Sequence, residues 1–117
     1  MTETTRLGDC YEAAVGLLLD LKIDGTVENA TLVHGLVTGT DGEVEGVRYG
    51  HAWVEIGDAV FDYSNGRKIV LRREHYYEVG NITDEDTTRY SWDEARAALL
   101  ENETYGPWED RFFYEEV

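Results

Sequence analysis

Apolar side chains recur at helical spacing near the start of the chain, in the segment DCYEAAVGLLLDL. The residues that follow this spacing are Ala13, Ala14, Leu17, Leu18 and Leu21. Aspartate commonly accepts hydrogen bonds from the free N–H groups at a helix start, and Asp9 stands just before the apolar stripe. The pattern therefore predicts a helix from Asp9 to Leu21, with Asp9 as its N-cap and Cys10 in its first turn.

Alternating and β-branched segments follow this helix and are typical of strands. TLVHGLVTG predicts one strand with His34 inside it, and HAWVEI and AVFDYS predict two more. Gly57 and Asp58 link the last two strands, which suits a two-residue type II′ hairpin turn. The segment TGTDGEVEGVRYG is rich in glycine and carboxylates, which predicts a flexible loop or the end of a hairpin.

The side chains of this hairpin can be assigned to two faces. If Ile56 faces Ala59 across the turn, the next pairs are Glu55 with Val60, Val54 with Phe61, Trp53 with Asp62, and Ala52 with Tyr63. Because side chains alternate, the apolar face contains Ala52, Val54, Ile56, Phe61 and Tyr63. The other face carries His51, Trp53, Glu55, Asp62 and Ser64. His51 and Asp62 become diagonal neighbours within reach of a hydrogen bond.

The second half of the chain is more polar. KIVLRREHYYEV predicts a third antiparallel strand of this sheet, and NITDEDTTRY predicts a polar loop whose carboxylates face solvent. Ser91 and Glu94 form a capping box, which predicts a second helix from Trp92 to Glu101. The aromatic tail YGPWEDRFFYEEV is expected to pack back on the domain through Trp108, Phe112 and Phe113.

Composition adds a strong acidic bias. The 117 residues include 25 Asp plus Glu against 10 Lys plus Arg, a formal net charge of -15 at pH 7. Nucleic acid and anionic membrane surfaces would be repelled, so we expect neither as a partner. Only two of the basic residues are lysines, a pattern that resembles proteins of salt-loving archaea and their viruses; the alternative is an ordinary acidic cytoplasmic protein.

The length and the apolar content of the chain limit the number of domains and the expected location of the protein. A chain of this size predicts one domain over residues 1–117, and the expected helices and antiparallel strands make its class α+β. No segment has the length and apolar character of a membrane span or a signal peptide, so we expect a cytoplasmic protein. The single cysteine excludes an internal disulfide and makes Cys10 either a buried filler or a reactive thiol.

Three residues suggest a cysteine nucleophile. The first turn of a helix is one of the environments that favour a thiolate, which is where the pattern places Cys10. His51 could take the thiol proton and return it to a leaving group, while Asp62 could hold the imidazole in the useful tautomer. Tyr11, Trp53 and Ser64 are candidates for lining the substrate site, although Trp53 also suits packing and Ser64 or Asn65 could replace Asp62 as orienter.

The order GDCYEAAVGLLL, TLVHGLVTG, GHAWVEIGDAVFDYS resembles the transglutaminase-like branch of the papain-like cysteine protease superfamily. In particular, it is similar to small bacterial transglutaminase-like proteases, including those that cleave leader peptides. The resemblance covers Gly8 to Ser64 and implies a Cys-bearing helix packed on a small antiparallel sheet. It also implies that Cys10 is the nucleophile, His51 the acid and base, and Asp62 the orienter in amide hydrolysis or acyl transfer through a thioester.

The chain departs from papain in one functional part. It contains no glutamine, so the side-chain oxyanion donor of papain is absent. The backbone N–H of Cys10, aided by Thr5 or Tyr11, is the expected replacement. The short N-terminus leaves little room for a substrate lobe, so a shallow pocket or a protein tail as substrate is expected.

Two alternatives stay open. One is a catalytically inactive binding module of viral or regulatory type, which would bind a basic partner through its acidic surface. The other resembles the NlpC-type endopeptidases, in which a strand histidine also follows a helix-start cysteine. Neither His34 nor His75 has a partner at metal-ligand spacing, so we expect no metal site. We also expect no cofactor. The expected substrate is a peptide or protein.

Overall fold

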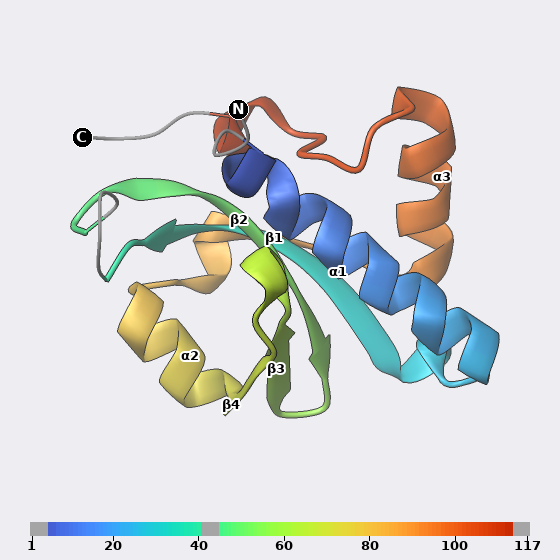
Figure 1. Ribbon diagram of the computed structural model, residues 1–117, viewed down its shortest axis with the longest axis horizontal. Helices are drawn as coiled ribbons and strands as arrows, with labels where there is room; N and C mark the ends of the chain where they lie inside the picture. Colours follow the sequence, from blue (N-terminus) through green and yellow to red (C-terminus); the bar gives the residue numbers. More distant parts are fainter. Residues whose placement is uncertain (1–4, 41–44, 114–117) are drawn as a thin grey trace.

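The structure is a computed structural model that describes the backbone of residues 5–40 and 45–113, and the side chains of these ranges except those of residues 5–9 and 65. Three helices are described: α1 (Thr5–Asp24), α2 (Arg73–Gly80) and α3 (Trp92–Asn102). Within the described residues, five strands form one antiparallel sheet in the order β4-β3-β2-β1-β5 (Figure 1). The α+β class predicted from the sequence is confirmed.

The strands differ in length and in position within the sheet. The two long central strands are β1 (Ala30–Thr38) and β2 (Arg48–Ile56), which pair along their whole length. The short strands β3 (Ala59–Asp62), β4 (Ile69–Arg72) and β5 (Thr87–Tyr90) flank them. Residues 41–44 of the expected glycine-rich loop lie outside the described residues.

The hairpin of β2 and β3 has the predicted register. Ile56 pairs with Ala59, Glu55 with Val60 and Val54 with Phe61. A type II′ turn requires a positive φ at its first central residue and a negative φ at its second. Gly57 has a φ of 59°, and Asp58 is not among the described residues with positive φ, so both residues fit this turn. The ladder between these strands ends at the Val54–Phe61 pair, so it is shorter than the sequence pattern predicted.

Each face of the sheet is covered by helices. Ala52 and Val54 belong to the core between the sheet, α1 and α3, together with Val15, Leu18 and Ala95. The opposite face forms a second core from Val33, Val37, Trp53, Val60 and Ile82, against which Tyr76 and Tyr77 of α2 pack. Burying a large apolar side chain contributes about 1.5–3 kcal/mol, so both faces stabilise the fold.

The predicted third strand was wrong in its second half. Only Ile69–Arg72 is a strand, and the chain then turns into α2, which ends at Asn81 with a φ of 55°. On a strand, the consecutive residues Tyr76 and Tyr77 would point to opposite faces. On a helix they are about 100° apart, so both can pack toward Trp53.

Two further sequence predictions need correction. The helix expected from Asp9 to Leu21 begins at Thr5 and ends at Asp24, so Asp9 is not its N-cap. The segment NITDEDTTRY was predicted as a loop, but Thr87–Tyr90 pairs with β1 as the edge strand β5. Polar β-branched residues suit an edge strand that faces solvent, which is why an apolar pattern was missing.

The C-terminal predictions are confirmed in part. α3 begins after Ser91 with the predicted capping box, in which Ser91 and Glu94 exchange side-chain to backbone hydrogen bonds. Phe112 is buried and Trp108 packs against the core, whereas Phe113 is 62% exposed. Among the described residues, no helix combines the length and apolar character needed to cross a membrane.

Candidate functional site

The candidate site lies where β3 ends. Asp62 is the last residue of β3, and the 3-10 turn Ser64–Gly66 that follows contacts α1. His51 lies on β2 beyond the last residue that pairs with β3. Its Nε2 donates to Asp62 Oδ2 at 3.0 Å, which is the contact expected from the hairpin register.

Cys10 completes this group from α1. Burial lowers the pKa of His51, but the charge of Cys10 and hydrogen bonds to Asp62 and Cys10 outweigh it and raise the pKa to about 10. Because Nε2 faces Asp62, Nδ1 is the nitrogen left for the thiol. The three residues that the sequence pointed to therefore form one connected chain of polar contacts, with the imidazole charged at neutral pH.

Asp62 is held by four donors. Oδ1 accepts from the Ser64 backbone N–H at 3.1 Å and from the Ser64 hydroxyl at 2.8 Å. Oδ2 accepts from the Tyr76 hydroxyl at 2.7 Å as well as from His51. Burial raises the pKa of Asp62, but its hydrogen bonds and the His51 charge hold it well below its usual range. Asp62 is therefore a fixed carboxylate that accepts a hydrogen bond from His51 Nε2–H without taking up the proton.

Tyr76 is a site residue that sequence reasoning missed. The prediction of a strand through residues 68–79 gave its side chain no defined position relative to Asp62. In the structure α2 places the Tyr76 hydroxyl on Asp62 and its ring 5.2 Å from Trp53 between centroids. The sequence held no clear signal of this position, because three successive residues such as HYY span about 200° around a helix and do not mark a single face.

The predicted lining residues are all buried. Tyr11 is 6% exposed, Trp53 0% and Ser64 2%. Ser64 donates to Asp62. The Trp53 ring contacts those of His51 and Tyr76, and its Nε1 donates to Glu55 at 2.9 Å. In this conformation the three side chains support the site from within instead of lining an open groove.

The expected oxyanion donor is not supplied by the first turn of the helix. Since α1 begins at Thr5, Cys10 lies in its second turn, where a backbone N–H bonds to the carbonyl four residues earlier. The side chain of Thr5 lies outside the described residues. The hydroxyl of Tyr11 is buried and has no hydrogen-bond partner among the described residues. Its pKa is raised far above the ordinary value, first by burial and then by the charge of Cys10, so it remains a proton donor.

The site is closed by close packing. Cys10 is 4% exposed and His51 9%. Gly50, next to His51, leaves no room for a side chain: a Cβ there would lie 2.2 Å from the Phe112 carbonyl oxygen and 2.6 Å from the Tyr11 hydroxyl. The C-terminal segment therefore packs directly on β2 beside the catalytic histidine candidate.

A second histidine, His34, is buried nearby without a role assigned by the sequence. It is 0% exposed, and neither ring nitrogen has a hydrogen-bond partner among the described residues. The rings of Tyr11 and Trp108 lie 4.9 Å from it and that of Tyr90 5.1 Å, between centroids. Burial lowers the pKa of His34 to about 3, so this imidazole is neutral.

Within the described ranges, no group of three or more His, Cys, Asp or Glu side chains is arranged to hold a metal ion. Comparison of the chain with family models, with curated proteins and with solved structures finds no match. The interpretation of the site therefore depends on its own geometry.

Proposed function

We propose that the protein is a cysteine-dependent amide hydrolase or acyltransferase with a papain-like, transglutaminase-like core. Cys10 is the nucleophile, His51 the acid and base, and Asp62 the orienter. One observation carries the proposal: the buried imidazole of His51 interacts with Cys10 and donates from its other nitrogen to Asp62 at 3.0 Å. This is the connectivity that nucleophilic catalysis by a thiol requires.

The reaction starts from a thiolate and an imidazolium. Cys10 Sγ attacks the carbonyl carbon of an amide, the C–N bond breaks, and His51 gives its proton to the leaving amine. The resulting thioester reacts with water or a second amine, whose proton returns to His51 as the C–S bond breaks. The products are an acid or a new amide, and both Cys10 and His51 regain their starting charges.

The carboxylate of Asp62 supports this cycle without changing its own charge. Its contact fixes a hydrogen on His51 Nε2, which leaves Nδ1 as the nitrogen that exchanges a proton with the thiol and the leaving group. Ser64 and Tyr76 hold the carboxylate in place, so the imidazole cannot rotate freely. A peptide or protein substrate reaches the thiol only after the residues that cover Cys10 move.

A catalytically inactive domain of the same fold is the second candidate, and the burial of Cys10 favours it. Buried cysteines are commonly inert, because reagents and substrates cannot reach them. The two candidates differ in whether the thiol carries a charge that depends on His51.

The first experiment measures that charge and that reactivity together, at high salt. The ultraviolet absorbance of the thiolate is followed from pH 5 to pH 10 in the parent, Cys10→Ser and His51→Ala, and iodoacetamide alkylation is timed in the same samples. The proposal predicts a Cys10-dependent thiolate signal at pH 7 that His51→Ala removes. Absorbance does not require access of a reagent, so it is informative even if the closed site alkylates slowly.

His75→Ala is the matched control, because His75 is exposed on α2 and away from the thiol. It should leave both signals as in the parent. A thiol that is neutral at pH 7 in the parent, or a thiolate signal that His51→Ala leaves unchanged, would contradict the enzyme and support the inactive domain.

A further inference from the structure

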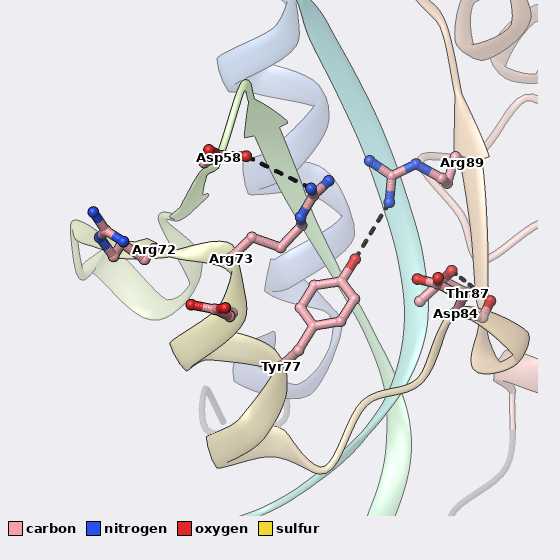
Figure 2. Close-up of a pocket in the computed structure, with 8 residues that line it drawn as sticks. Asp58, Arg72, Arg73, Tyr77, Asp84, Thr87 and Arg89 are labelled. Carbon is pink, nitrogen blue, oxygen red and sulfur yellow. Dashed lines mark hydrogen bonds and ion pairs between the residues drawn. The ribbon is translucent and has the colours of Figure 1, made fainter.

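A second site is formed on the face of the sheet that carries α2. A pocket of about 800 Å³ lies between the α2 side and the β5 side of this face. Arg73 and Tyr77 line it from α2, and Arg89 and Thr87 from β5 (Figure 2). The sequence pattern gave no indication of it, because the two arginines are distant in the chain and both segments were assigned differently.

Buried Glu55 lies under the two arginines. It is 2% exposed, and its Oε2 accepts from Trp53 Nε1 at 2.9 Å and from the Tyr77 hydroxyl at 2.6 Å. Its Oε1 accepts from Arg89 at 2.5 Å and from Arg73 at 3.5 Å. Burial raises the pKa of Glu55, but hydrogen bonds from Arg89, Tyr77 and Trp53 and the charge of Arg89 hold it below its ordinary value, so it is a carboxylate.

The two guanidinium groups are bound to Glu55 unequally. One buried carboxylate faces two guanidinium groups, and Arg89 together with the two neutral donors already satisfies it. Among the described residues, the Arg73 guanidinium makes long contacts, at 3.5 Å to Glu55 and 3.6 Å to Asp58, whose side chain is 94% exposed. Arg73 therefore keeps N–H donors available toward the pocket, where a planar anion could be bound by both guanidinium forks.

The rim limits how much negative charge a ligand can bring. Asp58, Glu74 and Asp84 also line the pocket, and all three are exposed carboxylates. A dianion such as phosphate would gain from the arginines but be repelled by these groups. A single carboxylate on a ligand whose remainder is neutral or cationic fits the balance better.

We propose that this pocket binds a zwitterionic ligand of the amino-acid or short-peptide class, with its carboxylate between Arg73 and Arg89. The cationic end lies toward the acidic rim. The pocket lies apart from the thiol site, because Glu55 is four residues from His51 along β2, a separation of about 13 Å.

The test uses triglycine as the probe and amide chemical shifts of the whole protein as the readout, in a buffer free of carboxylate and phosphate. We expect saturable shifts in the Arg73–Tyr77 and Thr87–Arg89 segments with a dissociation constant of about 1 mM, which is ordinary for a ligand of this size. Arg73→Gln should weaken binding about tenfold or more, because it removes a charged hydrogen-bond donor.

Arg73 is the informative position because its contacts are long, so its loss should not unfold the chain, whereas Arg89→Gln would also uncover Glu55. Arg96→Gln is the matched control, since Arg96 is exposed on α3 and is not among the residues that line the pocket. It should bind triglycine as the parent does.

Three results would overturn the proposal. Triglycine amide, which lacks the carboxylate, could bind as well as triglycine. Inorganic phosphate could bind more tightly than triglycine at the same residues. Finally, triglycine could produce no saturable shifts at ten times the expected dissociation constant.

Discussion

The two buried histidines differ in what surrounds their rings. His51 interacts with Asp62 and Cys10, and these interactions outweigh its burial and raise its pKa to about 10. His34 has only aromatic rings around it and no hydrogen-bond partner among the described residues, and burial lowers its pKa to about 3. The same side chain is therefore charged at one position and neutral at the other at pH 7, which gives opposite dependences of stability on pH.

We expect His51 to be an imidazolium from pH 6 to pH 8 and to lose its proton near pH 10. A pKa raised on folding stabilises the fold fully below the unfolded value of about 6.5, and this contribution is lost as the pH rises through about 10. Asp62→Asn should move the midpoint down toward 6.5. Nitrogen chemical shifts of the imidazole measure both, and a neutral His51 ring at pH 7 in the parent would contradict the site described here.

His34 should destabilise the protein in acid. Its folded pKa is depressed, so the unfolded chain binds a proton below about pH 6.5 that the folded chain takes up only near pH 3. The free energy of unfolding should fall by about 2 kcal/mol from pH 7 to pH 5 on account of this group. Urea unfolding of the parent, His34→Phe and His34→Gln at both pH values measures it.

Both variants lack the titrating imidazole ring. The replacing side chain is apolar in His34→Phe and polar in His34→Gln. Both should lose most of the difference between pH 7 and pH 5, whatever their stability at pH 7. If the two variants kept the full dependence of the parent, the acid sensitivity would belong to other groups.

At the level of elements, β2 and the C-terminal segment approach so closely at Gly50 that no side chain fits there. Gly50→Ala should destabilise the protein by about 1–3 kcal/mol, because the new Cβ meets the Phe112 backbone, which cannot rotate away as a side chain could. Gly16→Ala is the matched control. Nothing lies within 4 Å of a Cβ there, and alanine should stabilise α1 by about 1 kcal/mol.

Urea unfolding of the two variants checks this pair. Equal effects of the same sign at Gly50 and Gly16 would mean that backbone preference, and not contact with Phe112, decides the cost. Amide shifts of Trp108 to Phe113 in Gly50→Ala would locate any displacement of the C-terminal segment.

Elements that are specified by residues close together in the sequence could be predicted, whereas elements that depend on distant contacts could not. The β2–β3 register followed from alternation and a two-residue turn, and it placed His51 beside Asp62 correctly. The start of α1 and the helix α2 could not be found in the same way. α2 is stabilised by packing of Tyr76 and Tyr77 on Trp53, contacts between residues more than 20 positions apart.

The site was predictable to the same extent. Cys10, His51 and Asp62 came from position and resemblance, whereas Tyr76 and the Arg73–Arg89 pocket depend on α2 and β5, which the pattern assigned to other structures. The charge on Glu55 illustrates the limit, because its four donors come from β2, α2 and β5. No single segment of the sequence contains that information.

For the whole molecule, the dominant feature is the net charge of -15 at pH 7. The described part extends over 38 × 31 × 27 Å. Most carboxylates therefore lie closer to one another than the Debye length, which is about 30 Å at 0.01 M salt. Their repulsion acts against the compact state. At 1 M salt the Debye length is about 3 Å, and only direct neighbours still interact.

The free energy of unfolding, measured with urea, should therefore rise by about 1 kcal/mol or more between 0.01 M and 1 M KCl, since each exposed like-charge pair costs a few tenths of a kcal/mol. The double variant Asp84→Asn, Glu85→Gln separates screening from a general effect of salt, because both residues are exposed in one acidic turn. It should be more stable than the parent at 0.01 M and equal to it at 1 M. An equal gain at both salt concentrations would show that the removed charges act through local structure, and a rise that continues undiminished beyond 1 M would point to exclusion of salt from the protein surface instead of screening.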